Sequence, residues 1–264
     1  MPTVRIAAVG DVHVSKTSHG ALAPILTQVA DRADVLLLCG DLTDYGTADE
    51  ARVLVKELGT LRLPTIAVLG NHDYESGHPE QVVDALRDVG VTVLDGDSHE
   101  VHGIGFAGVK GFCGGFGRGT LGSWGEPMVK AFVKEALDET LKLETALARL
   151  RTPQKVAVLH YSPVRDTVEG EPLEIFPFLG CSRHEEPLLR YQVSATFHGH
   201  AHNGHPEGRL QNGAPVYNVA LPLLRKRDPN ALPVKFIELD PEGPGADGAA
   251  RYDGMERRAG AGSR

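Results

Sequence analysis

The stretch TIAVLGNHD, residues 65–73, begins as an uninterrupted run of mostly apolar residues and ends in a glycine, an amide, an imidazole and a carboxylate. The apolar part is typical of a buried strand, and Pro64 separates it from the segment before it. Gly, Asn and Asp are also ordinary turn formers, so the polar residues alone indicate a turn as readily as a site. Their meaning depends on whether other strands of the chain end in the same way.

Two earlier segments repeat this strand–loop–helix pattern. The strand-like runs and the helical patterns that follow them cover residues 4–9, 21–32, 35–39 and 48–58. The first run ends at Gly10-Asp11 and the second at Gly40-Asp41, and a Thr-x-x-Glu capping box at Thr47 opens the second helix. In an open α/β sheet, ligands collect beyond the carboxyl ends of the strands. We therefore expect the three polar loops to meet at one edge of a sheet.

The rest of the chain contains further elements and a distinct end. Helices are predicted over residues 79–89 and 126–150, and strands over residues 91–94, 104–109, 155–159, 195–197, 215–219 and 234–239. No clear helices separate the later strands, so we expect the second half to be more antiparallel, making a second sheet or extending the first. The Gly-rich residues 110–125 are interpreted as a surface loop. We predict one domain over residues 1–240 and a disordered tail rich in Gly, Ala and Arg over residues 241–264.

Composition and charge exclude several classes of protein. The 264 residues are 41% hydrophobic and 23% charged, which is ordinary for a globular domain. The net charge of -8 argues against a nucleic-acid partner, because such proteins usually present a basic face. A small anionic substrate remains compatible, since bound metal ions invert the local potential. Three cysteines without zinc-type spacing, no leader-like segment and no membrane-length apolar stretch predict a cytoplasmic protein with no membrane partner.

Polar residues with metal-binding side chains follow five of the apolar strands. They are Asp11, His13, Asp41, Asn71, His72, His160, His200 and His202. Oxygen and imidazole ligands without cysteine suit manganese, iron, zinc or nickel better than calcium, which prefers oxygen alone. In Asp11-x-His13 and His200-x-His202 the two residues are two apart, so on an extended segment they face the same side. Either pair alone is a weak signal, but five such segments in order predict one metal site.

The blocks GDVH (residues 10–13), GD (40–41), GNHD (70–73), His160 and GHAH (199–202) together resemble the calcineurin-like metallophosphoesterase superfamily. They occur in the order of that family over about residues 4–220. The resemblance implies an α/β fold, a four-layer α/β/β/α sandwich of two mixed sheets flanked by helices. The compact size is most similar to small bacterial cyclic-nucleotide phosphodiesterases.

The same resemblance implies a pair of divalent or trivalent metal ions bridged by Asp41. The other ligands that it implies are Asp11, His13 and His202 for the first ion and Asn71, His160 and His200 for the second. Manganese, iron and zinc are the expected metals, and nickel or cobalt would also fit these donors.

A binuclear centre of this kind predicts phosphoester hydrolysis. Two cations about 3.5–4 Å apart clamp the attacking and leaving oxygens of an in-line displacement and acidify a bound water, so that hydroxide attacks phosphorus. His72 directly follows the ligand Asn71 and is predicted to donate a proton to the departing alkoxide, acting as the catalytic acid. Asp73 is predicted to orient the His72 ring or to support the ligands from behind. We expect small phosphodiesters, such as cyclic nucleotides, as substrates.

Other functions on the same centre stay open at this stage. A phosphomonoesterase acting on nucleotides or proteins, a nuclease, and a non-catalytic metal-binding scaffold all share the ligand set. His198 is interpreted as a strand-end residue. Asp44 is interpreted as a residue at a helix start, with support of the metal ligands as its alternative role. Ser162 lacks the Gly-x-Ser-x-Gly elbow of a serine nucleophile. The sequence predicts no oligomeric state.

Overall fold

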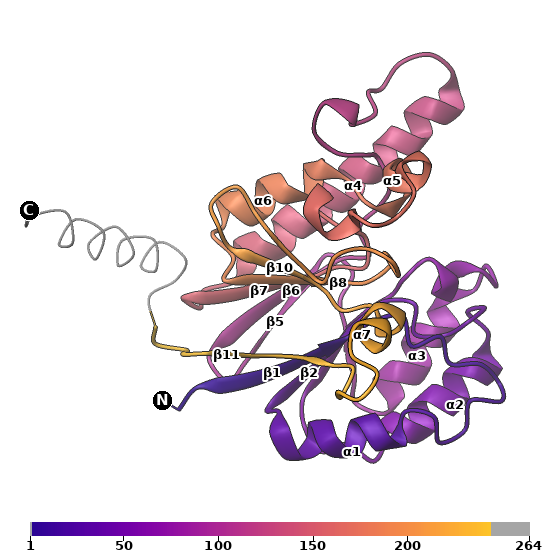
Figure 1. Ribbon diagram of the computed structural model, residues 1–264, viewed down its shortest axis with the longest axis vertical. Helices are drawn as coiled ribbons and strands as arrows, with labels where there is room; N and C mark the ends of the chain where they lie inside the picture. The colour runs from indigo at the N-terminus through magenta and orange to yellow at the C-terminus, as the bar shows by residue number, and fades with distance from the viewer. Residues whose placement is uncertain (1, 244–264) are drawn as a thin grey trace, which may run out of the picture.

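The apolar strands of the first half form a five-stranded sheet with helices on one face (Figure 1). In spatial order its strands are β11 (Lys235–Leu239), β1 (Val4–Val9), β2 (Val35–Cys39), β3 (Thr65–Val68) and β4 (Thr92–Val93). β1 to β4 are parallel, and β11 is antiparallel to β1. Every residue of β2 and β3 is buried, as expected for strands that are covered on both faces.

Three helices cover this sheet: α1 (Ala23–Arg32), α2 (Ala48–Leu58) and α3 (Pro79–Asp88). The predicted capping box is confirmed, because the Thr47 hydroxyl accepts from the Glu50 amide while the Glu50 carboxylate accepts from the Thr47 amide. α1 and α3 each carry a proline in the first turn, where its missing N–H costs nothing. The observed helices lie within two residues of the predicted ranges.

A second sheet of six strands packs on the first. In spatial order its strands are β5 (Asp97–Val101), β6 (Ile104–Gly108), β7 (Gln154–Val158), β8 (Ala195–His198), β10 (Pro215–Asn218) and β9 (Glu207–Arg209). β6, β7, β8 and β10 are parallel, and only the edge strands β5 and β9 are antiparallel. The second half is the more antiparallel one, as expected, and it forms a second sheet, but β7, β8 and β10, for which the lack of predicted helices indicated antiparallel pairing, are parallel.

Short helices explain that error. β6 connects to β7 through the long helix α4 (Pro127–Arg149), but the connection from β7 to β8 contains only α5 (Phe176–Leu179), α6 (Glu185–Arg190) and single 3-10 turns. Elements of four to six residues are too short to produce a helical repeat of apolar residues. α7 (Leu221–Arg227), after β10, has only seven residues and was not predicted.

Three apolar cores separate the layers. One lies between α1–α3 and the first sheet, with Val29 and Leu54 fully buried, and one lies between the two sheets, with Phe106 and Phe197 fully buried. The third packs the second sheet against α4 and α6. Full burial of one large apolar side chain contributes about 1.5–3 kcal/mol. These layers are the α/β/β/α sandwich of two mixed sheets, so the predicted fold class is confirmed.

The computed structural model describes residues 2–243. The predicted tail lies outside the described residues from residue 244 onward. Within the described part, no helix combines the length and the apolar character needed to cross a membrane.

Candidate metal centre

The carboxyl ends of strands from both sheets bring the predicted residues together. β1, β2 and β3 lead into the loops of Asp11, Asp41 and Asn71, and β7 and β8 lead into those of His160 and His200. Three groups of His and Asp side chains have ligand atoms within 4.8 Å of one another: Asp11, His13 and His202; Asp41, His160 and His200; and His13, Asp44 and His72.

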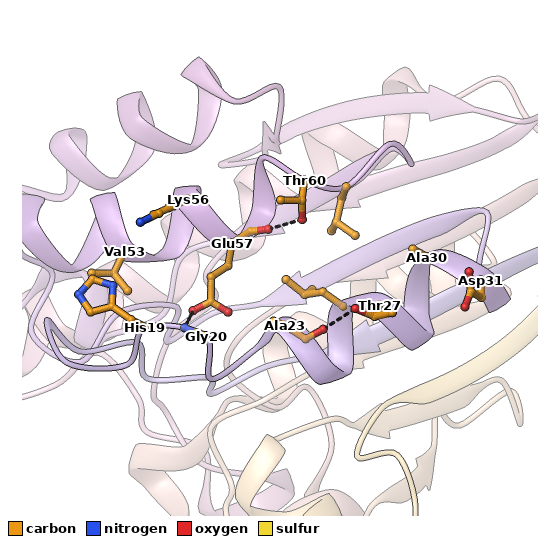
Figure 2. A pocket seen from close by; sticks show the side chains of 12 residues that line it. His19, Gly20, Ala23, Thr27, Ala30, Asp31, Val53, Lys56, Glu57 and Thr60 are labelled. Atoms are coloured by element: carbon orange, nitrogen blue, oxygen red, sulfur yellow. Dashed lines mark hydrogen bonds between the residues drawn. The ribbon is translucent and has the colours of Figure 1, made fainter.

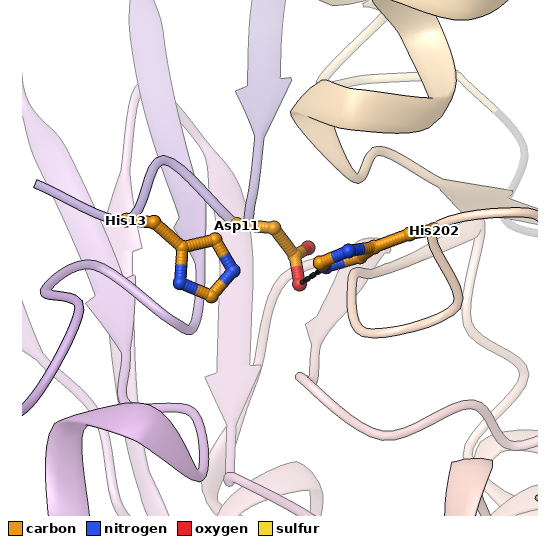
Figure 3. A group of neighbouring side chains, drawn as sticks. All are labelled: Asp11, His13 and His202. Atoms are coloured by element: carbon orange, nitrogen blue, oxygen red, sulfur yellow. Dashed lines mark hydrogen bonds and ion pairs between the residues drawn. The ribbon is translucent and has the colours of Figure 1, made fainter.

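The first group joins the loops after β1 and β8 (Figure 3). The buried Asp11 carboxylate accepts a hydrogen bond from His202 Nε2 at 2.9 Å. Among the described residues, neither ring nitrogen of His13 has a hydrogen-bond partner, although both atoms are buried. Burial lowers the pKa of His13, which favours the neutral ring that can bind a metal. Unpartnered buried nitrogens are costly, and a metal ion would satisfy one of them.

The second group has its imidazoles oriented by backbone carbonyls. The Cys39 carbonyl lies 3.1 Å from His160 Nδ1, and the Phe178 carbonyl lies 3.1 Å from His200 Nε2. A metal-binding histidine normally donates its other N–H to such a group, which fixes its tautomer. The nitrogens left for a ligand are Nε2 of His160, which lies 3.0 Å from Asn71 Oδ1, and Nδ1 of His200.

Asp41 lies between the two groups. Its Oδ2 is 3.9 Å from His13 Nε2 and its Oδ1 is 3.3 Å from His160 Nε2, so each oxygen faces one group. Burial disfavours the charged ring of His160, but the Asp41 carboxylate outweighs burial and raises the pKa of His160 to about 9. Burial also opposes ionisation of Asp41, yet His160 lowers the pKa of that carboxyl well below its usual range. Without a metal, the proton on His160 therefore balances the Asp41 charge.

The backbone is strained at four of these positions. Six described residues other than glycine have a positive φ, and four of them are predicted ligands: Asp11 (53°), His13 (43°), Asp41 (49°) and His200 (70°). Each such residue costs of order 1–3 kcal/mol and persists only where the surroundings impose it. Strain of this kind concentrates at functional sites, so its position here is an indication of function that is independent of the side chains.

Two glycines allow the loops to touch. A Cβ at Gly70 would lie 2.2 Å from Asp41 Oδ1, and a Cβ at Gly199 would lie 2.1 Å from Asp11 Oδ2. No side chain fits at either distance. Each glycine thus packs against the carboxylate of another loop, which fixes where that carboxylate lies.

His72 lies beside the first group, with its ring centroid 4.6 Å from that of His13. The Nδ1 atom of His72 lies 2.7 Å from the Asp44 carbonyl and donates a hydrogen bond to it. Nε2 is therefore the ring nitrogen that this bond leaves available for other contacts. Asp44 does not start a helix, because α2 begins with Thr47 as its N-cap. The Asp44 carboxylate lies 3.6 Å from His13 Nδ1, which matches the alternative prediction of a supporting role. The sequence signal for this role is weak, because it consists of the position of Asp44 three residues after Asp41.

Asp73 does not orient the His72 ring. Its buried carboxylate instead accepts from the amides of Leu42, Thr43 and Gly70 and from the Thr43 hydroxyl, at 2.7–3.2 Å. It ties the loop after β2 to the loop after β3. The supporting role predicted as the alternative for Asp73 matches these contacts.

Other candidate residues point elsewhere. The ring nitrogens of His198 contact the Gly199 carbonyl and the Thr167 hydroxyl, each at 2.8 Å. The Ser162 hydroxyl donates to the Val164 carbonyl at 2.7 Å, so it is not free to act as a nucleophile.

A cavity of about 460 Å³ lies between α1 and α2 (Figure 2). The residues that line it include Ala23, Val53 and Glu57, and none of the predicted site residues is among them. Glu57 accepts from the amides of Gly20 and Leu22 at 2.8 Å each, so it ties α2 to the start of α1. We therefore assign this cavity no part in the metal centre.

Comparisons with known proteins agree with the arrangement. Residues 4–204 match the model of a family described as calcineurin-like phosphoesterase. Over 93 residues the chain is 31% identical to an uncharacterized protein of Methanocaldococcus jannaschii. The matched region covers 35% of this chain and 39% of that protein.

Two solved structures share the fold at low identity. A phosphopantetheinyl hydrolase from Mycobacterium tuberculosis superposes with a TM-score of 0.66 at 17% identity, over 91% of this chain and 98% of that chain. A putative 5'-nucleotidase from Staphylococcus aureus superposes with a TM-score of 0.52 at 17% identity, over 82% of this chain and 48% of that chain.

Proposed function

This chain belongs to the calcineurin-like phosphoesterase family, and from that membership and the geometry above we propose that it hydrolyses small phosphodiesters at a pair of metal ions. Asp41 is the proposed bridging ligand. The other proposed ligands are Asp11, His13 and His202 for one ion and Asn71, His160 and His200 for the other. The observation that carries the proposal is the position of Asp41, with Oδ2 toward His13 and Oδ1 toward His160.

The donor set fits metal ions of intermediate hardness. It consists of carboxylate, amide and imidazole groups, which favours manganese, iron or zinc. The unpartnered nitrogens of His13 and the carbonyl-bound second nitrogens of His160 and His200 support the fit. When bound, the two ions would acidify a water and offset the negative charge of the phosphoryl oxygens.

His72 is proposed as the proton donor. Because Nδ1 donates to the Asp44 carbonyl, Nε2 carries a transferable proton only when the ring is positively charged. The Nε2 proton would pass to the departing alkoxide, and the ring would return to neutral. The Asp44 carbonyl keeps the ring in one orientation throughout.

Small diesters such as cyclic nucleotides are the proposed substrates. The acidic net charge disfavours a long nucleic acid, whose phosphates would need a basic face. A small substrate needs charge compensation only at the centre itself.

The test is an assay of the purified full chain with manganese on bis-p-nitrophenyl phosphate and p-nitrophenyl phosphate. We expect turnover of the diester that requires added metal and is abolished by a chelator. Faster turnover of the monoester would favour a phosphatase, and fewer than two tightly bound ions would favour a scaffold. No turnover of any phosphoester with any divalent metal would overturn the proposal.

The extent of the domain and its compartment are proposed on separate grounds. Val4 of β1 pairs with Leu239 of β11. The last described strand therefore belongs to the first sheet and ends next to the proposed boundary at residue 240. The three cysteines are free and buried, which supports the proposed cytoplasmic location.

A further inference from the structure

An exposed apolar segment lies directly beside the metal centre. Leu173, Ile175 and Phe178 are 66%, 37% and 55% exposed, and we call these three residues the apolar shelf. Phe176 and Leu179, between and after them, are buried and pack with Val168 and Ala201. Ala201 separates the proposed ligands His200 and His202 in sequence. The segment is thus anchored through its buried side to the loop that carries those ligands.

The backbone at Phe178 is fixed from several directions. Its carbonyl accepts from His200 Nε2 at 3.1 Å and from Cys113 Sγ at 3.3 Å. The neighbouring carbonyls of Pro177 and Leu179 accept the amides of Gly114 at 2.7 Å and Ser162 at 3.1 Å. A phenyl ring cannot lie far from its own carbonyl, so the Phe178 ring is near His200 and is still exposed.

Two other exposed aromatic residues are close in sequence to predicted site residues. Among the described residues four aromatic side chains are more than a third exposed: Tyr45, Tyr74, Trp124 and Phe178. Tyr45 follows Asp44, Tyr74 is two residues after His72, and Phe178 binds His200 through its carbonyl. Only Trp124 belongs to a loop without a link of this kind. Apolar surface that stays exposed in a folded protein often marks a binding site.

We propose that the apolar shelf binds a planar ring carried by the phosphoester substrate, of the class of a nucleobase. This inference rests on the proposed function and names the substrate class for the same site. An open face suits a flat ring, which gains stacking contact from one side, whereas an alkyl chain needs a groove that encloses it. The hydrogen-bonded backbone at Phe178 fixes the position of the residue that carries the stacking ring, so only the side-chain rotation is lost on binding. Phe178 is therefore a specificity-determining residue.

The experiment compares two substrates with the same reacting atoms. Adenosine 3',5'-cyclic phosphate and the same cyclic ribose phosphate without its base share the phosphodiester and the leaving group. In the manganese-loaded enzyme, Phe178→Ala is expected to raise KM for the nucleotide about tenfold and to leave its kcat unchanged. Both kcat and KM for the base-free substrate are expected to stay the same. Phe178→Tyr is expected to restore the wild-type KM. Trp124→Ala, which removes an exposed aromatic ring outside the shelf, is the matched control.

Equal effects of Phe178→Ala on both substrates, or no effect on either, would overturn the proposal that the apolar shelf binds the base. Binding of adenosine 5'-monophosphate to the metal-free protein, measured by calorimetry, separates this failure from that of the proposed function. If Phe178→Ala bound this nucleotide more weakly and the wild type showed no turnover, base binding by the apolar shelf would be supported and phosphodiesterase activity would be excluded. Equal binding by both proteins would overturn the shelf whatever the enzyme hydrolyses.

Discussion

Gly199→Ala is the substitution that tests the geometry of the centre with the smallest chemical change. The backbone at Gly199 lies outside the left-handed region, so alanine can adopt it, and the added Cβ would lie 2.1 Å from Asp11 Oδ2. Gly119→Ala is the matched control, because a Cβ there meets nothing within 4 Å and that backbone is likewise not left-handed. The two variants differ only in what the new methyl group contacts.

The size of the effect follows from the bonds that Asp11 makes. Ordinary contact with a Cβ begins at 3.4 Å, so the carboxylate must shift by more than about 1 Å. In the wild-type structure the Asp11 carboxylate accepts hydrogen bonds from the His200 amide at 3.0 Å and from His202 Nε2 at 2.9 Å. A hydrogen bond to a charged group contributes about 1.5–3 kcal/mol, and Gly→Ala regains up to ~1 kcal/mol through the unfolded chain. Loss of both bonds, less this gain, is a net loss of about 2–5 kcal/mol. A 1 Å displacement also lowers turnover about 10²-fold.

Three measurements on both variants check this prediction. Thermal unfolding should show a Tm about 5–15 °C lower for Gly199→Ala, and for Gly119→Ala an unchanged Tm or a rise of at most about 2–4 °C. Metal content and diester turnover should fall only in Gly199→Ala. If Gly199→Ala bound metal and turned over substrate as Gly119→Ala does, the close contact with Asp11 would have no bearing on the chemistry, and Asp11 would not be a ligand.

Three further predictions concern single residues. Asp41→Asn should lower the metal content below two ions per chain and reduce diester turnover at least about 10²-fold, and an unchanged metal content by mass spectrometry would exclude a bridging role. His72→Gln should lower kcat about 10²–10⁴-fold for an alkyl diester but much less for a p-nitrophenyl ester, whose leaving group needs no proton; equal losses would contradict the role of acid. Burial lowers the pKa of His184 to about 4, and its Nε2 accepts the Phe112 amide at 3.0 Å. The unfolded chain takes up a proton below about pH 6.5 while the fold does not, so stability is full above pH 6.5 and falls toward pH 4. Between pH 7 and pH 5 the free energy of unfolding, measured with denaturant, should therefore fall by about 2 kcal/mol less in His184→Gln than in the wild type. An identical fall in both proteins would refute the lowered pKa of His184.

The parts of the fold that depend on long, regular patterns were predictable from the sequence. Helices of ten residues or more show a clear apolar repeat, and the capping box at Thr47 fixed the start of α2. Strand direction in the second half was not predictable, because α5 and α6 are too short to mark the crossover between β7 and β8. Pairing between strands far apart in sequence, such as β1 with β11, leaves no local signal at all.

The predicted ligands come together because each follows a strand, and strand ends of parallel sheets share an edge. The contacts that orient them were not predictable. The carbonyls of Cys39, Asp44 and Phe178 hold the rings of His160, His72 and His200, and any residue type can supply a carbonyl. The side chain of Asp73 could be predicted to support the centre, but not that its partners are three amides of neighbouring loops.

The strained backbone and the close-packed glycines lead to one conclusion about how the centre is held. If rotamers alone placed the ligands, the backbone at Asp11, Asp41 and His200 would be free to relax to a negative φ. It does not relax, because the loops lock one another: Gly199 packs on Asp11, and Gly70 packs on Asp41. The apolar cores that stabilise the sandwich contain none of the proposed ligands, so the strain is offset by layers that have no part in binding metal. The proposed ligand set is therefore preorganised by the fold, unlike the ligands of small zinc domains, in which the metal itself drives folding.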